Sequence, residues 1–175
     1  MRSKHLYLVV CGLFFCSAVL VGCSKSDPNS GTGASAAGSK FLLTAEPQNA
    51  KGIKEARGST QDAEEITVVG RIGGDTDPWV KGQAAFLVVD TALKPCNEKD
   101  DDACTTPWDY CCDSDTLPDN KAMVKFVDAN GSTVATDARE LLGVKELQTV
   151  VVQGKAKRDE SGNLTLLATG IFVRN

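Results

Sequence analysis

Histidine is almost absent from this sequence. The single histidine, His5, stands near the start of the chain, just before a long apolar run. A serine–histidine–aspartate triad needs histidine as its general base, so the rest of the chain cannot form one. The sequence also lacks the G-x-G-x-x-G fingerprint of dinucleotide-binding folds and the acidic loop of EF-hand calcium sites. Because no catalytic constellation is found, we expect a protein that is not an enzyme.

Cysteine pairs with the spacing of common metal or redox motifs are missing as well. Seven, six and zero residues separate four cysteines in the second half of the chain, which are Cys96, Cys104, Cys111 and Cys112. Structural zinc sites usually contain C-x2-4-C pairs, and thiol–disulfide oxidoreductases contain C-x-x-C. Between Glu98 and Asp119 there are eight acids, and their negative charge would raise the pKa of nearby thiols. These features disfavour a redox centre.

The N-terminus has the form of a secretory signal. A basic start, MRSKH, precedes an uncharged apolar run over residues 6–22, close to the lower limit of a membrane span. The run ends in Leu20-Val21-Gly22-Cys23, which resembles the lipobox of bacterial lipoproteins. That resemblance implies a signal peptide over 1–22, diacylglycerol and an N-acyl chain on Cys23, and a cell-envelope location facing the periplasm or at the outer membrane. An uncleaved anchor or an ordinary secretory signal is the alternative.

Residues 23–40 follow as the lipidated cysteine and a flexible tether rich in serine, glycine and alanine. Cleavage after residue 22 would remove His5 and two cysteines, and Cys23 would carry lipid. Four cysteines would then remain in an oxidising compartment, which favours two disulfides whose pairing the sequence does not determine. Apart from the lipid we expect no cofactor.

Residues 41–175 have the pattern of a mainly β domain. A short helix is expected near 47–57 and another over 136–144, capped by Thr136 or Asp137 and ended by Gly143. Five strand-like runs cover 65–74, 84–90, 121–128, 148–158 and 164–175. The order of three strands, a short helix and two strands predicts a five-stranded OB-like Greek-key barrel. A β-sandwich, which usually needs seven strands, is the alternative.

The cysteines lie in a long insertion, residues 91–120, between the second and third strands. Such a segment without helix or strand periodicity is unusual unless it is stapled or functional. If the segment is extended, Cys111 and Cys112 point to opposite sides, and each would bond to Cys96 or Cys104. A metal site made of the four thiolates, suited to a soft ion such as copper(I), is the alternative.

The same insertion offers a possible ligand or partner surface made of Trp108, Asp109, Tyr110, Asp113 and Asp115. In an extended chain the two aromatic rings would share one face, either as a stacking platform or packed over the disulfides. The acids would supply oxygen ligands, or simply form a solvated surface. Nucleic acid is not expected as a partner, because an acidic domain outside the cytoplasm lacks the required positive charge.

The segment PWDYCC, residues 107–112, resembles the cysteine loop of small envelope lipoproteins of unknown function. We therefore expect a lipid-anchored, non-enzymatic envelope protein whose disulfide-stapled acidic loop forms a structural or binding surface. Its partner would be a protein, peptide or glycan of the envelope. The alternative is an envelope metal-binding or metal-delivery protein that uses the cysteines or the acidic loop.

Overall fold

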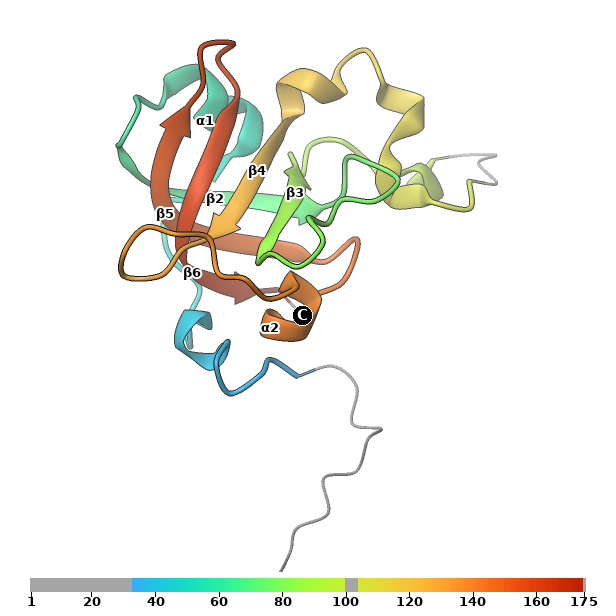
Figure 1. Cartoon of the computed structure of the whole chain (residues 1–175). Helices are drawn as coiled ribbons and strands as arrows, with labels where there is room; N and C mark the ends of the chain where they lie inside the picture. Colours follow the sequence, from blue (N-terminus) through green and yellow to red (C-terminus); the bar gives the residue numbers. More distant parts are fainter. Residues whose placement is uncertain (1–32, 100–103, 175) are drawn as a thin grey trace, which may run out of the picture. The chain divides into compact units, whose positions relative to one another are not determined.

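The computed structural model describes residues 33–99 and 104–174, in which five strands close into a barrel (Figure 1). The signal peptide and Cys23 lie outside the described residues. The barrel strands are β2 (Glu65–Ile72), β3 (Ala85–Val89), β4 (Lys121–Phe126), β5 (Thr149–Arg158) and β6 (Leu164–Val173). Neighbouring strands are antiparallel except β4 and β6, which are parallel, and the pairing of β2 with β5 closes the barrel.

This strand order is that of an OB-fold, so the predicted barrel is confirmed. The short helix α2 (Ala138–Leu142) lies between β4 and β5, as expected. Two elements precede the barrel: β1 (Lys51–Gly52), which pairs in parallel with β2, and α1 (Ile53–Ser59). The helix expected near 47–57 therefore begins later in the chain. Within the described residues, no helix has both the length and the apolar character that a membrane span requires.

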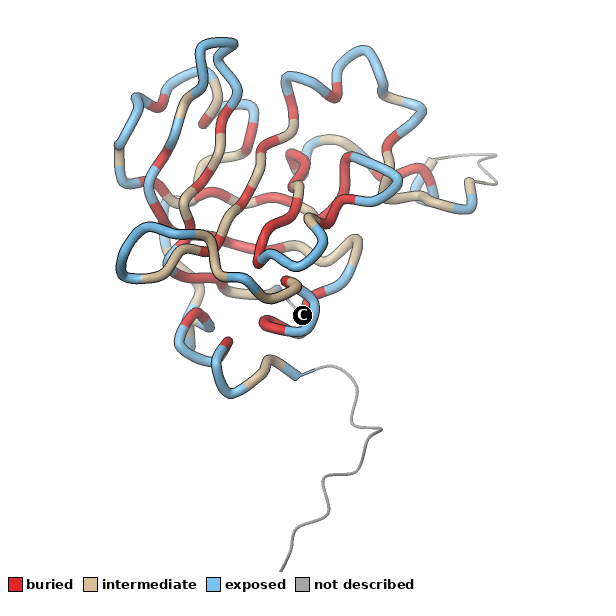
Figure 2. Tube along the Cα trace, in the orientation of Figure 1, coloured by how far each residue is buried: buried red, intermediate tan, exposed pale blue. Residues whose placement is uncertain are grey.

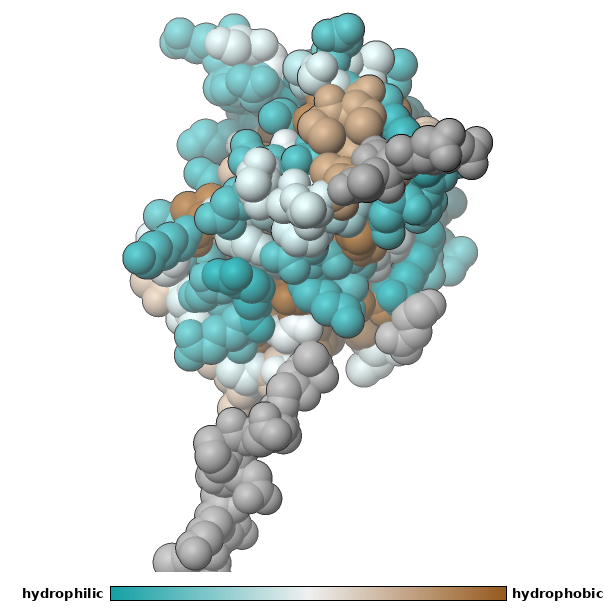
Figure 3. Space-filling model, turned by 90° about the vertical axis from the view of Figure 1, so that its right-hand side faces the viewer, coloured by the Kyte–Doolittle hydropathy of each residue, from teal (hydrophilic) through white to brown (hydrophobic). Residues whose placement is uncertain are grey.

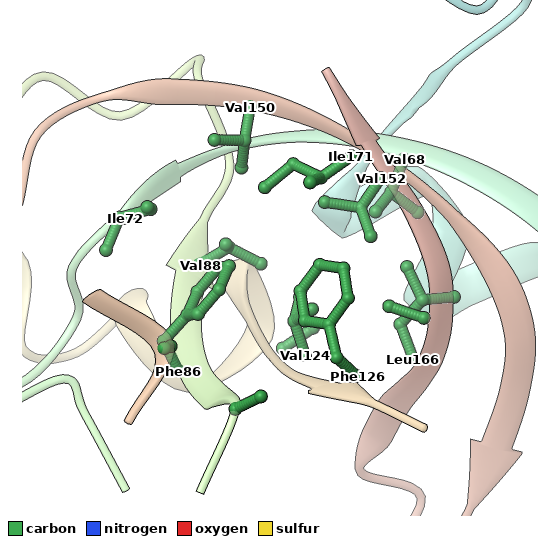
Figure 4. Close-up of a cluster of buried hydrophobic side chains, with 14 of the residues drawn as sticks. Val68, Ile72, Phe86, Val88, Val124, Phe126, Val150, Val152, Leu166 and Ile171 are labelled. Atoms are coloured by element: carbon green, nitrogen blue, oxygen red, sulfur yellow. The ribbon is translucent and has the colours of Figure 1, made fainter. Parts of the chain in front are cut away.

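Alternation of apolar and polar residues builds the core. Along β2 and β4 every second residue is buried, and the residues between them face outward (Figure 2). The inward side chains meet in the middle of the barrel (Figure 4), where they include Val68, Ile72, Phe86, Val88, Val124, Phe126, Val150, Val152, Leu166 and Ile171. Since full burial of one such side chain contributes about 1.5–3 kcal/mol, this interior supplies most of the driving force for folding.

Gly70 lies where β2 changes its partner. Residues 65–71 pair with β5, whereas residues 71–72 pair with β3. A Cβ atom on Gly70 would lie 3.0 Å from Cβ of Val88 and 3.2 Å from the carbonyl oxygen of Val89. The absence of a side chain therefore lets β3 pass close to β2 at the position where the barrel turns.

Helix α2 has the caps that its sequence predicts. Its N-cap is Asp137, whose Oδ1 accepts a hydrogen bond from the backbone N–H of Arg139 at 3.0 Å. Gly143 ends the helix with a φ of 69°, in the left-handed region that favours glycine. Of the two expected caps, Thr136 and Asp137, the structure uses the second.

The predicted tether is too long at its C-terminal end. The backbone N–H of Ser35 donates to the carbonyl of Leu141 at 3.0 Å, and Gly38 is buried against the same carbonyl, where a Cβ atom would not fit. The domain expected to begin at residue 41 thus also includes the residues from about 35 onward. Small residues in this stretch pack closely against α2. A composition rich in serine, glycine and alanine predicts flexibility and does not reveal this contact.

Replacement of Asp137 by alanine should lower the free energy of unfolding by about 1 kcal/mol, the usual effect of losing an N-cap. Hydrogen bonding with the Arg139 side chain, at 3.0 Å, holds the pKa of Asp137 below its usual range. The difference in free energy of unfolding between wild type and D137A should therefore be largest near neutral pH and should decrease as the pH falls through that lowered pKa. Urea unfolding at several pH values measures it. Glu140→Ala, at an exposed position of the same helix, is the matched control and should change stability little.

Candidate functional site: the cysteine loop

The cysteine loop joins β3 to β4 and projects from the side of the barrel (Figure 1). Its described part contains short 3-10 turns at Cys96–Glu98, Pro107–Asp109, Cys111–Asp113 and Leu117–Asn120. The predicted insertion between the second and third barrel strands is thus present, although it is coiled and not extended. On the face toward which it projects, hydrophobic side chains gather in a patch amid hydrophilic ones (Figure 3).

Tyr110 anchors this loop to the barrel. Its side chain is fully buried and packs in a small second core with Val89 and Leu117, with Leu93 at the edge. Burial raises the pKa of Tyr110, an effect that the Arg71 guanidinium only partly offsets. The prediction that Tyr110 belongs to an exposed ligand surface is therefore wrong, since its ring lies inside the protein.

The backbone at Tyr110 determines the direction of the loop. Its φ of 57° and ψ of 33° place it in the left-handed region, which is uncommon for a residue with a side chain. Two 3-10 turns, one before and one after Tyr110, meet at this residue. The change of direction brings Asp109 and Cys111, two residues apart in sequence, to the same small region of the loop.

Trp108 also connects the cysteine loop to the barrel, through the segment that follows β2. Its indole Nε1 donates to the carbonyl of Thr76 at 3.1 Å, and its own carbonyl accepts from the N–H of Gly74 at 2.7 Å. A Cβ atom on Gly73 would collide with that same carbonyl and approach the Tyr110 ring to 3.1 Å. The double glycine that follows β2 thus allows the loop backbone to lie directly on it. Trp108 and the buried Tyr110 do not share an exposed face, as a stacking platform would require.

Three sulfur atoms and one carboxylate oxygen converge in the loop. The Sγ atom of Cys111 lies 3.8 Å from those of both Cys96 and Cys104. Oδ1 of Asp109 lies 4.0 Å from the sulfurs of Cys96 and Cys104. All four atoms lie within 4.8 Å of one another, and we call Cys96, Cys104, Asp109 and Cys111 the cysteine cluster. Cys96 is buried at its base, whereas Cys111 is exposed.

The predicted disulfides are not present in this structure. A disulfide joins two sulfurs at about 2.05 Å, whereas the closest described pairs lie at 3.8 Å and the adjacent Cys111 and Cys112 at 4.0 Å. The prediction assumed an extended chain in which these two side chains point to opposite sides. They lie instead on a 3-10 turn, where successive side chains do not alternate.

Asp109 is held in place by other groups of the loop. Its Oδ2 accepts from the hydroxyl of Thr106 at 2.8 Å, and its Oδ1 accepts from the backbone N–H of Cys111 at 2.9 Å. Burial by itself would raise the pKa of Asp109, but these hydrogen bonds hold it below its usual range. The carboxylate is therefore ionised near neutral pH and points at the thiols in a fixed orientation.

The thiol of Cys111 is surrounded by acceptors. Its pKa is raised above the ordinary range, first by Asp109 and then by the sulfurs of Cys96 and Cys104. Negative and electron-rich neighbours disfavour a thiolate that has no cation beside it. A cation at the centre of the cluster would reverse this effect, because a metal ion is then the largest local charge.

The other two acids of the predicted ligand surface, Asp113 and Asp115, lie outside the cysteine cluster. Asp113 accepts from the ammonium group of Lys99 at 2.7 Å, in an ion pair whose side chains are 28% and 23% exposed. This hydrogen bond raises the pKa of Lys99. Asp115 is exposed and stands outside the cysteine cluster. Of the acids proposed as oxygen ligands, only Asp109 thus faces the sulfurs.

Comparisons with known proteins give a distant structural likeness. No family model and no curated protein matches this chain. Among solved structures, an aspartyl tRNA synthetase from Entamoeba histolytica is similar with a TM-score of 0.45 at 9% sequence identity. The match covers 81% of this chain and 26% of that one, so the chain spans about a quarter of the synthetase structure.

Replacement of Tyr110 should separate the effect of its ring from that of its hydroxyl. The phenol oxygen is buried without a hydrogen-bond partner among the described residues, so Tyr110→Phe should change the free energy of unfolding by less than about 1 kcal/mol. Tyr110→Ala empties the second core and should lower it by about 3–5 kcal/mol, as for other large buried aromatic residues. Urea unfolding of both variants checks this. Equal losses in the two would contradict the assigned role of the ring.

Proposed function

We propose that this protein is a lipid-anchored, non-enzymatic protein of the cell envelope that binds a thiophilic metal ion through the cysteine cluster. The observation that carries the proposal is the spacing of the sulfurs, 3.8 Å from Cys111 to each of Cys96 and Cys104. Ligands placed tetrahedrally at a zinc–sulfur distance of about 2.3 Å are separated by roughly 3.8 Å. We therefore prefer metal binding to the disulfide-stapled surface that the sequence analysis favoured.

The ligand types favour zinc(II). Three cysteine sulfurs suit either zinc(II) or copper(I), since soft thiolates bind both. The oxygen of Asp109, 4.0 Å from two of the sulfurs, adds a harder ligand that zinc accepts and copper(I) does not prefer. The sulfur of the neighbouring Cys112 lies 4.0 Å from that of Cys111, but it is not part of this group of four ligand atoms.

The burial of the ligands supports reversible binding. Cys96 is buried, but Cys111 is exposed, so one side of the cluster is open to solvent. An open site gives an ion or a partner direct access to one thiolate, as capture or delivery of metal requires.

The envelope location rests on the sequence of the N-terminus. The segment Leu20-Val21-Gly22-Cys23 and the small polar residues after it have the arrangement of a lipidation site followed by a tether. Stable anchoring requires more than one acyl chain, which such a lipidated cysteine carries. A protein, peptide or glycan of the envelope would be the partner of the loop, and the metal would order the surface that meets it.

Zinc titration of the reduced protein under exclusion of oxygen tests the proposal. We expect one zinc per chain, and Cys111→Ser should weaken affinity by at least about tenfold because it removes a central ligand. Cys112→Ser, the adjacent cysteine, is the matched control and should bind nearly as tightly. Competition with a chromophoric chelator provides the affinities.

Two results would contradict the proposal. One is an absence of zinc uptake by protein that has four free thiols after residue 90. The other combines two measurements on protein from an oxidising compartment. Its intact mass would show a loss of about four hydrogens to two disulfides, and the protein would take up no zinc after mild reduction.

Asp109→Asn should identify the metal that the cluster prefers. The amide keeps the size of the carboxylate and its capacity to accept the 2.9 Å hydrogen bond from Cys111 N–H, but it loses the charge. We expect zinc affinity to fall by about tenfold and copper(I) affinity to stay nearly constant, since copper(I) is satisfied by sulfur ligands. Parallel competition titrations with the two ions measure this. An equal decrease for both ions would mean that Asp109 acts only by positioning the loop.

A further inference from the structure

A row of hollows lined by cations lies on the outside of the barrel, and one of its cations, Lys121, also lines the separate hollow beside Asp109 and Cys111. Three adjoining cavities of about 210, 280 and 270 Å3 lie over the seam of β4 and β6 and beside α1. The first and second share Thr165, and the first and third share Arg57. Together they form what we call the basic groove, whose cations are Lys54, Arg57, Lys121, Lys125, Lys157 and Arg158.

The charge of the basic groove is not neutralised by its surroundings. Only two lining residues, Asp119 and Asp159, are acidic, and none of the six cations forms an ion pair with a carboxylate of the described residues. The chain as a whole has a formal charge of −4. A concave strip of one sign on a protein of the opposite net sign concentrates the electrostatic field toward an anionic ligand.

The groove has a rigid frame. The guanidinium of Arg158 donates to the carbonyl of Thr60 at 3.1 Å and to that of Gly162 at 3.0 Å, which ties the end of α1 to the turn between β5 and β6. Arg57 donates to the carbonyl of Lys121 at 3.2 Å, which ties α1 to β4. The guanidinium groups of Arg57 and Arg158 are therefore held in place before any ligand binds.

We propose that the basic groove binds an extended anionic glycan, one whose sugars carry phosphate or carboxylate groups. Lys121 and Lys125 lie four residues apart on β4, a separation of about 13 Å, and the remaining cations extend the row on both sides. One small anion reaches two or three such cations, whereas a polymer with repeated charges reaches all of them. The apolar floor at Leu87, Met123 and Leu164 suits the C–H faces of sugar rings.

Features of the groove disfavour other polyanions. Its described lining has no aromatic ring, whereas single-stranded nucleic acid is bound by stacking its bases on such rings. Both β4 and β6 are paired on each side, so an acidic peptide finds no free edge to extend the sheet.

The basic groove is also poorly suited to binding an anionic membrane surface. Among described residues the only exposed large hydrophobic side chain is Leu42, so the groove offers no apolar wedge for insertion. Leu42 bridges to Ile171 near the end of β6, whereas the hollows lie beside its first residues, roughly 20 Å away along the strand. In Figure 1 the segment before β1 accordingly lies at the lower end of the barrel and the turn between β5 and β6 at the upper end.

Binding of fluorescent polygalacturonate to the detergent-solubilised full-length protein tests this inference. We expect saturable binding that weakens with salt, and a decrease of about tenfold or more in Lys125→Glu/Lys157→Glu. Lys81→Glu/Lys145→Glu makes the same charge change at exposed positions outside the groove and should retain most of the affinity. Neutral dextran should not bind.

Three results would overturn the inference: equal losses in the two double variants, undiminished binding by Lys125→Glu/Lys157→Glu, or equal or tighter binding of oligo(dT), polyglutamate or phosphatidylglycerol vesicles. The location of the partner rests on the proposed envelope location, but the binding itself does not. Zinc affinity of Lys125→Glu/Lys157→Glu should equal that of the wild type, so failure of the groove and failure of the metal site are distinguishable.

Discussion

Burial of Tyr110 is the interaction on which the candidate site depends. The described part of the loop between β3 and β4 has no strand pairing of its own, and the ring of Tyr110 joins the loop to Val89 and Leu117 in a second core. The left-handed backbone at that residue turns the chain between Asp109 and Cys111 and brings both to the cysteine cluster. One buried aromatic side chain thus compensates for an unfavourable backbone conformation and positions the ligand atoms on either side of it.

The barrel contributes a rigid base with two separate faces. At the end of β2, Gly73 and Gly74 let the loop backbone approach closely, so the cysteine cluster rests on an element that the barrel core stabilises. The basic groove uses the seam of β4 and β6 and contains none of the four residues of the cysteine cluster, although its Lys121 also lines the hollow beside Asp109 and Cys111. An acidic loop that gathers thiols and a basic groove can therefore coexist on one small domain of net negative charge.

The fold was predictable from sequence because the strands alternate and their ends carry turn or cap residues. Runs such as 121–128 and 148–158 match β4 and β5 closely, and Asp137 and Gly143 mark α2. The site was predictable only in part. The cysteines were identified, but their arrangement depends on 3-10 turns and on the left-handed Tyr110, which leave no periodic pattern in the sequence. Asp109 was expected only as part of an acidic surface, because its contacts with the sulfurs of Cys96 and Cys104, thirteen and five residues away, depend on this arrangement.

X-ray absorption at the zinc edge identifies the atoms that surround the bound ion. For the zinc-loaded, reduced protein we expect a four-coordinate ion with three sulfur neighbours at about 2.3 Å and one oxygen neighbour at about 2.0–2.2 Å. In Asp109→Asn the oxygen shell should weaken while the three sulfurs stay. A spectrum showing an ion surrounded only by oxygen or nitrogen atoms would contradict metal binding by the cysteine cluster, because it would place the metal elsewhere.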